Sequence, residues 1–306
     1  MDALLPDPWD EARVEDDFAV TRIGVLASGR MPAERGMVAS WLACTGELLD
    51  QWASWGWAVP ELRLVRFDPE RVRAVITPDR PLVRAREIDT LLRLRLDGNL
   101  DLCGHLSGPP PAEPFVYEWS AAAHLEPPDW ISLFLDVSIV GAVPEEVRRR
   151  ITRQVVQVVR TTVADPRIHY AEAGPRSMAH GATPWEDAYD EDPMASGARL
   201  APQWLRGTGA VTYVHDRVVD ALGGRQHLGA ALVDAEVLPS EEGVVVVARP
   251  SLWSEDPRQD ARIRAAVAER LVPLDPLLDA VRFAADWVGG PDAASVDAHF
   301  ATETWD

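Results

Sequence analysis

The stretch WISLFLDVSIV, residues 130–140, decides the fold class together with the run that follows it. Apolar side chains recur there at every second position, which is the period of a β-strand with one buried face. Pro144 then opens a helix, with Glu145 and Glu146 favourably placed at its positive end. The buried stripe of that helix comprises Val147, Ile151, Val155, Val158, Val159 and Thr162. A long strand followed directly by an amphipathic helix is therefore the central unit of the chain.

Similar patterns continue on both sides of this unit. The alternation of side chains predicts strands at 18–28, 61–67, 168–171 and 210–215, and hairpins at 90–106 and at 236–249. Helical spacing predicts helices at 37–55, 216–222, 226–232, 256–271 and 274–287. Because several strands follow one another without a helix between them, we predict an α+β fold. Its sheet is mixed and largely antiparallel, with helices packed mainly on one face.

The chain divides at a segment rich in Gly, Pro and acidic residues. We expect a single α+β domain over residues 18–290, with tails at 1–17 and 289–306. The acidic loop 174–196 separates lobe 18–172 from lobe 198–290, and the two lobes could share one sheet. A loop of this length inside a compact domain is either functional or disordered.

The composition excludes several kinds of function. All 30 basic residues are arginine, and they face 49 Asp and Glu, for a net charge of -19. Without lysine there is no phosphate-loop lysine and no Schiff base. The negative field makes nucleic acid an unsuitable partner and favours a basic one. No segment has the length of a membrane helix or the features of a secretory signal, so we expect a cytoplasmic protein without membrane contact. The absence of lysine also fits a GC-rich genome, so composition does not separate function from codon usage.

The strongest candidate site is a cluster of carboxylates with two aromatic residues between them. It comprises Trp185, Glu186, Asp187, Tyr189, Asp190, Glu191 and Asp192. Three interpretations remain open. The cluster could bind a divalent metal, although it lacks the glycine and the spacing of a calcium loop. It could supply a catalytic acid pair together with a histidine such as His180. It could also be an acidic loop, solvated or facing a partner, whose aromatic side chains anchor a protein interface.

Other motifs indicate structure rather than chemistry. None of the seven histidines belongs to an HExxH pattern, and no GxSxG motif is present. Gly207-Thr208-Gly209 precedes a strand, whereas a phosphate loop opens a helix. Gly223-Gly224 is typical of a helix end. Cys44 and Cys103 have no zinc-site spacing and are expected as buried thiols. The sequence therefore predicts no catalytic residue, no metal site and no cofactor.

Several segments resemble immunity-protein families of actinobacterial polymorphic toxin systems, including the type VI secretion immunity family. The earlier segments are 48–52 (LLDQW), 93–104 (RLRLDGNLDLCG), 165–173 (DPRIHYAEA) and 183–188 (TPWEDA). The later ones are Leu205-Arg206-Gly207, 211–213, Leu222-Gly223-Gly224 and the hairpin 236–248. The chain has Thr208 where the group has tyrosine after the Arg-Gly pair. The resemblance implies an α+β protein that binds and neutralises a toxin, and it implies no catalytic residues.

The expected function is accordingly a non-enzymatic, cytoplasmic immunity protein that neutralises a basic toxin. Two alternatives stay open. One is a structural or accessory component of a larger assembly or biosynthetic pathway. The other is an enzyme that uses the carboxylates of residues 185–192, with or without a metal. The identity of the partner and the oligomeric state do not follow from the sequence.

Overall fold

A computed structural model describes eight continuous ranges of the chain and six isolated residues. The ranges are 20–30, 63–68, 71–76, 100–105, 114–126, 130–175, 203–253, 256–271, and the isolated residues are Met37, Ser40, Trp41, Cys44, Thr45 and Leu48. All structural statements below concern these residues.

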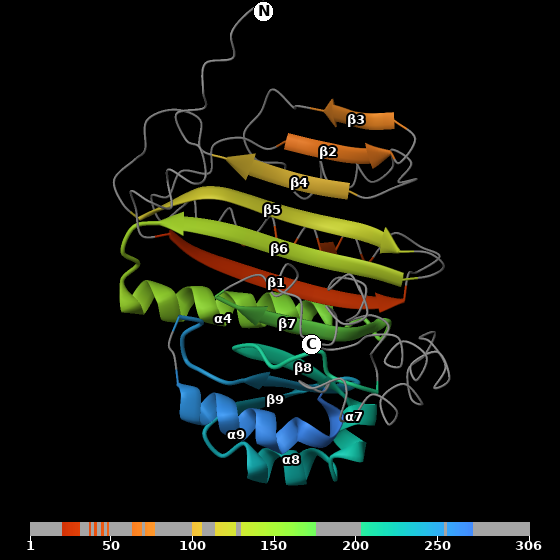
Figure 1. Cartoon of the computed structure of the whole chain (residues 1–306), viewed down its shortest axis with the longest axis vertical. Helices are drawn as coiled ribbons and strands as arrows, with labels where there is room; N and C mark the ends of the chain where they lie inside the picture. Colours follow the sequence, from red (N-terminus) through yellow and green to blue (C-terminus); the bar gives the residue numbers. More distant parts are fainter. Residues whose placement is uncertain are drawn as a thin grey trace, which may run out of the picture.

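Ten strands form one sheet in the order β3-β2-β4-β5-β6-β1-β7-β8-β10-β9, and every neighbouring pair is antiparallel. Figure 1 shows the strands stacked along the long axis of the molecule. Their bounds are β1 Val20–Arg30, β2 Arg63–Asp68, β3 Arg71–Ile76, β4 Leu100–His105, β5 Phe115–Glu126, β6 Trp130–Val140, β7 Ile168–Gly174, β8 Val211–His215, β9 Glu236–Ser240 and β10 Gly243–Val247.

One face of this sheet is apolar and carries the long helix α4, Glu145–Thr162. Strand β6 supplies Ile131, Leu133, Leu135, Val137 and Ile139, none of them more than 1% exposed. They belong to one core cluster with the α4 residues Ile151, Val155 and Val159 and with the β10 residues Val245 and Val247. The alternation in residues 130–140 therefore fixes which side of β6 faces the helix. The described residues between Met37 and Leu48 are helical, and Trp41 and Leu48 join the same cluster.

Three shorter helices pack against the opposite face at one end of the sheet. They are α7 Asp216–Ala221, α8 Arg225–Ala231 and α9 Pro257–Val267, followed by the 3-10 turn η2 Ala268–Arg270. Val214, Val244 and Val246 of the strands form a second cluster with Val218 and Val219 of α7. These strand residues alternate with those that face α4, so the two helix groups cover opposite faces (Figure 1).

The turn between α7 and α8 requires glycine. Gly223 and Gly224 have φ angles of 93° and 91°. Any residue with a Cβ atom is strained at such positive φ angles, whereas glycine is not. The prediction that this pair ends a helix is confirmed, because α7 ends at Ala221 and α8 starts at Arg225.

The predicted fold class is confirmed: the chain is α+β with an antiparallel sheet. As expected, helices cover one face of the sheet: α4 and the 37–48 helix pack there. Helices α7 to α9 add a second layer on the other face. The sequence prediction missed β5, in which AAAH at 121–124 weakens the alternation, and it did not include β3, which follows β2. Residues 90–99 of the expected hairpin and residues 176–196 of the acidic loop lie outside the described ranges, so the division into lobes stays a prediction.

None of the helices in the described ranges combines the length and the apolar character that crossing a bilayer requires.

Candidate functional site

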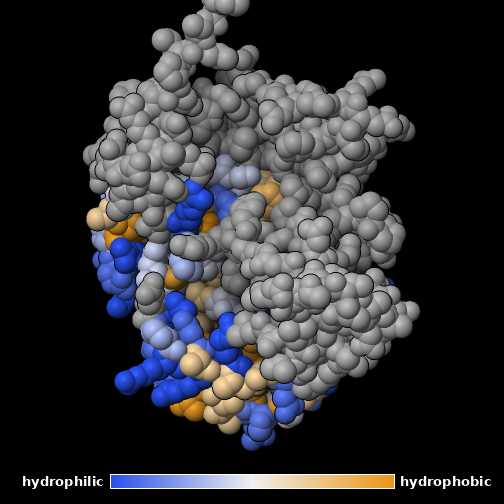
Figure 2. Space-filling model, in the orientation of Figure 1, coloured by the Kyte–Doolittle hydropathy of each residue, from blue (hydrophilic) through white to orange (hydrophobic). Residues whose placement is uncertain are grey.

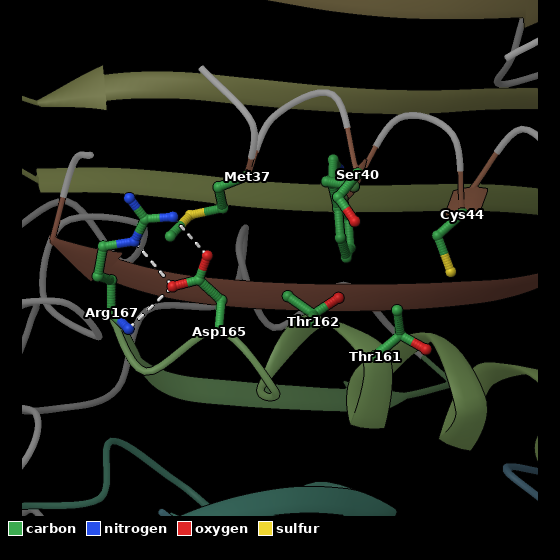
Figure 3. A pocket seen from close by; sticks show the side chains of 8 residues that line it. Met37, Ser40, Cys44, Thr161, Thr162, Asp165 and Arg167 are labelled. Carbon is green, nitrogen blue, oxygen red and sulfur yellow. Dashed lines mark hydrogen bonds and ion pairs between the residues drawn. The ribbon is translucent and has the colours of Figure 1, made fainter. Parts of the chain in front are cut away.

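An open pocket of about 110 Å³ lies between the 37–48 helix and the C-terminal end of α4. Its lining comprises Met37, Ser40, Trp41, Cys44, Thr161, Thr162, Asp165 and Arg167. Figure 3 shows Asp165 and Arg167 facing each other at one end beside Met37, with Thr161 and Cys44 toward the other end. The walls thus combine hydroxyl groups, a thiol and one ion pair.

The ion pair follows from the tight turn between α4 and β7. Asp165 Oδ1 accepts hydrogen bonds from the backbone N–H and the Nε of Arg167, at 3.0 and 2.8 Å, and Oδ2 accepts one from Nη2 at 2.6 Å. The side-chain hydrogen bonds from Arg167 lower the pKa of Asp165 from its ordinary value, against a smaller opposing effect of burial. Both groups therefore stay ionised at neutral pH, and their charges compensate each other at one end of the pocket.

The size of the pocket limits what it can bind. Sites for metabolites and cofactors usually enclose roughly 300–1,000 Å³. A volume of about 110 Å³ is closer to that of a single side chain. The pocket therefore suits one residue of a protein partner better than a small-molecule substrate.

A second polar group lies where β7 begins and β8 ends. The rings of His169 and His215 are 5.7 Å apart at an interplanar angle of 85°. His215 Nε2 lies 3.7 Å from Oε2 of Glu242, and the hydroxyl of Tyr213 donates to the Glu242 carbonyl at 2.8 Å. Burial lowers the pKa of His169 to about 4 and also lowers the pKa of His215, while it raises that of Tyr213. At neutral pH both imidazoles are uncharged.

The third polar group is fully buried on the sheet face opposite α4. Arg206 Nη1 donates to Glu172 Oε1 at 3.2 Å, and the Tyr170 hydroxyl donates to Glu172 Oε2. The side chains of Arg206 and Glu172 are 0% and 1% exposed. A buried ion pair of this kind contributes mainly to structural specificity, because desolvation offsets much of its attraction.

The residues proposed from the sequence as partner-binding candidates, Trp185 to Asp192, lie outside the described ranges, as does His180. The pocket was not predicted, although its Asp165-Pro166-Arg167 motif was visible in the sequence. In the described ranges no three His, Cys, Asp or Glu side chains are grouped so that they could hold a metal ion. Cys44 is a free thiol at the pocket wall.

Charge is distributed unevenly along the chain. The described residues hold 20 arginines and 18 Asp and Glu, and the remaining residues hold 10 arginines and 31 Asp and Glu, which together give the 30 and 49 of the whole chain. The described residues are thus nearly balanced at +2, whereas the other segments of the chain carry -21. The negative charge predicted to attract a basic partner lies in those segments, which include residues 185–192.

The described surface has no single dominant character. Figure 2 shows hydrophilic residues over much of it, with hydrophobic residues gathered at the lower end, in the area of α8 and α9. Val233, just after α8, is 80% exposed. Asp234 beside it pairs with Arg262 of α9.

Comparison with known proteins shows a likeness of fold. No family model matches the chain, and no curated protein matches it. Its structure is similar to the solved structure of the Pseudomonas aeruginosa T6SS protein PA0821, with a TM-score of 0.53 and 16% sequence identity. The similarity covers 83% of this chain and 73% of that one. At this identity the likeness concerns the fold.

Proposed function

We propose that this chain is a non-catalytic binding protein of a type VI secretion system, and specifically an immunity protein that neutralises a basic effector. The observation that carries the proposal is the fold similarity to a T6SS protein over 83% of the chain. The sequence resemblance to type VI immunity families points to the same system from independent features. A fold alone does not determine function, so the proposal also depends on the properties of the surface.

Two surface features support binding of a protein over turnover of a small molecule. The pocket of about 110 Å³ holds a single side chain, and its one carboxylate is engaged in three hydrogen bonds with Arg167. A carboxylate held ionised in this way is a poor general acid. The acid excess belongs to residues outside the described ranges, and the described residues are nearly neutral; a negative charge of this size can steer a basic partner.

One feature argues against the alternative of a component that polymerises through its sheet. The edge strand β9 contains Pro239, which has no N–H to donate. Exposed carboxylates flank it at Glu236 and Glu241. Prolines and charges on an edge strand oppose pairing with a second sheet. Edge-to-edge assembly at β9 is therefore disfavoured.

The proposal is tested with type VI effectors of the source organism, beginning with any encoded next to this gene. Each effector is produced in a sensitive host with and without this chain. We expect one effector whose toxicity is relieved and which elutes with the chain as a stable complex. If no effector is neutralised and none forms a complex at low salt, the proposal is wrong.

The pocket is tested in the same assay. Thr161→Phe fills it, and Gln157→Phe adds the same ring one turn earlier on the exposed side of α4. If the pocket receives a partner side chain, Thr161→Phe weakens the complex at least about tenfold, the scale of a modest interface hot spot, and Gln157→Phe leaves it intact. Equal affinities of the two variants for the effector would show that the pocket is not part of the interface.

A further inference from the structure

The inference concerns His215, the last residue of β8 and the residue that precedes α7. Its Nδ1 accepts a hydrogen bond of 3.2 Å from the backbone N–H of Arg217. The side chain thereby caps the first turn of α7, a role that more often falls to Ser, Thr, Asp or Asn. Those residues keep their acceptor over the physiological pH range, whereas an imidazole nitrogen accepts a hydrogen bond only while it is unprotonated.

We infer that His215 is an acid-sensitive cap: protonation of Nδ1 breaks its hydrogen bond with Arg217 and releases the first turn of α7. In the neutral ring the proton must lie on Nε2, because Nδ1 is the acceptor. Protonation turns Nδ1 into a donor that faces another donor. The helix start is also the positive end of α7, so a cation at this position is unfavourable.

Of the groups around His215, some oppose the positive charge of its protonated ring and others favour it. The Arg217 side chain opposes the imidazolium, whereas the ring of His169 in β7, 5.7 Å away, is uncharged down to about pH 4. Glu242 of the β9–β10 turn and Asp216 of α7 favour the imidazolium. Tyr213 contacts the ring edge to face, and Arg30 of β1 acts on His169. Because His215 is only 8% exposed, burial outweighs the carboxylates, and its pKa is lowered.

The release is expected to be local. The Asp216 N–H and the Tyr213 hydroxyl both donate to the carbonyl of Glu242, at 2.8 Å each. Neither bond involves a group that titrates in mild acid. The β9–β10 turn therefore stays attached while the first turn of α7 opens.

The test is a pH titration of the whole chain by NMR, following the His215 ring and the hydrogen-exchange protection of the Arg217 amide. In the wild-type protein we expect the protection of the Arg217 amide to fall about twofold to thirtyfold, which corresponds to the measured range of cap energies. The midpoint of this fall should coincide with the midpoint of the His215 titration. In His215→Asn, whose side-chain oxygen does not titrate, protection should persist through the same range. His169→Gln should keep the effect, because His169 takes no part in the hydrogen bond between His215 Nδ1 and the Arg217 amide.

Two results would overturn the inference. One is protection of the Arg217 amide that does not change while the His215 ring titrates. The other is an equal loss in wild type and in His215→Asn. If His215→Asn does not fold, the wild-type titration decides alone, because the two midpoints either coincide or differ. The outcome is independent of whether the chain binds an effector.

Discussion

The hydroxyl of Thr152 in α4 accepts a hydrogen bond of 2.9 Å from the backbone N–H of Leu252, one hundred residues further along the chain. Leu252 is fully buried in the core beneath α4, and the Arg148 guanidinium lies 5.9 Å from the ring centre of the adjacent Trp253. One helix is thus fastened both to the sheet that precedes it and to the segment that follows β10. This contact joins the early and late parts of the chain.

Removal of this hydroxyl should destabilise the protein. Thr152→Val keeps the shape of the side chain but leaves the Leu252 N–H buried without an acceptor. We expect a loss of about 1–3 kcal/mol in the free energy of unfolding, measured by urea denaturation. Thr161→Val is the matched control on the same helix, because Thr161 is exposed, and it should change stability by less than about 0.5 kcal/mol. Equal effects would show that the contact across the core does not matter.

Loss of the arginine should destabilise the protein more in the buried pair of Arg206 and Glu172 than in a surface pair. Arg206→Met removes the cation from Glu172 and should cost about 3–5 kcal/mol in the free energy of unfolding. Arg225→Met makes the same change in the exposed pair with Asp216 and should cost no more than about 1 kcal/mol. A small effect at both positions in urea denaturation would contradict the burial of the first pair.

Substitution by alanine should have opposite effects on stability at two glycines. At Gly243 a Cβ would lie 2.3 Å from the Val214 carbonyl oxygen, so Gly243→Ala must displace backbone and destabilise the β8–β10 pair. At Gly229, inside α8, a Cβ meets nothing within 4 Å. Gly229→Ala should therefore stabilise the protein by about 0.5–1 kcal/mol through helix propensity. Thermal unfolding of both variants and the wild type checks this ranking of stabilities. A stabilised Gly243→Ala would contradict the close approach of the Gly243 backbone to the Val214 carbonyl.

Acidification should weaken the fold through His169. Its pKa is about 4 in the folded protein against 6.5 ordinarily, so the unfolded chain binds a proton first. The contribution of His169 to stability is therefore complete above pH 6.5 and is lost as the pH falls from 6.5 toward 4. Below that window the lowered pKa of Asp165 acts in the same direction.

The measurement is urea denaturation at a series of pH values. His169→Gln should flatten the fall between pH 6.5 and 4. His227→Gln, which changes an exposed histidine on α8, should reproduce the wild-type curve. An unchanged slope in His169→Gln would mean that other groups cause the acid sensitivity.

Much of the fold follows from local patterns in the sequence. The strict alternation of residues 130–140 and the apolar stripe of 145–162 gave β6 and α4 almost to the residue, because each has one fully buried face. Asp256-Pro257 marked the start of α9, and the Asp256 side chain does cap it. The small alanines of β5 carry a weak hydrophobic signal, so that strand was missed although it lies in the middle of the sheet.

The candidate site was less predictable, for a physical reason. The pocket combines residues from the 37–48 helix with residues more than one hundred positions later, and no local pattern encodes that proximity. Histidine as a helix cap was hidden in the same way, because His215 reads as the end of a strand. The acidic residues 185–192 stand out only by composition, and their role stays a prediction.

We expect this chain to recognise its protein partner through the negative charge of residues 185–192 and of the other segments outside the described ranges. The direct measurement is the affinity of the purified chain for the neutralised effector at low and at physiological salt. Asp190→Asn, Glu191→Gln and Asp192→Asn together should weaken binding and reduce its salt dependence. Asp220→Asn, Glu236→Gln and Glu241→Gln together remove the same charge from exposed positions of the described surface and should leave both unchanged. Equal effects of the two triple variants, or an affinity that salt does not alter, would contradict the account.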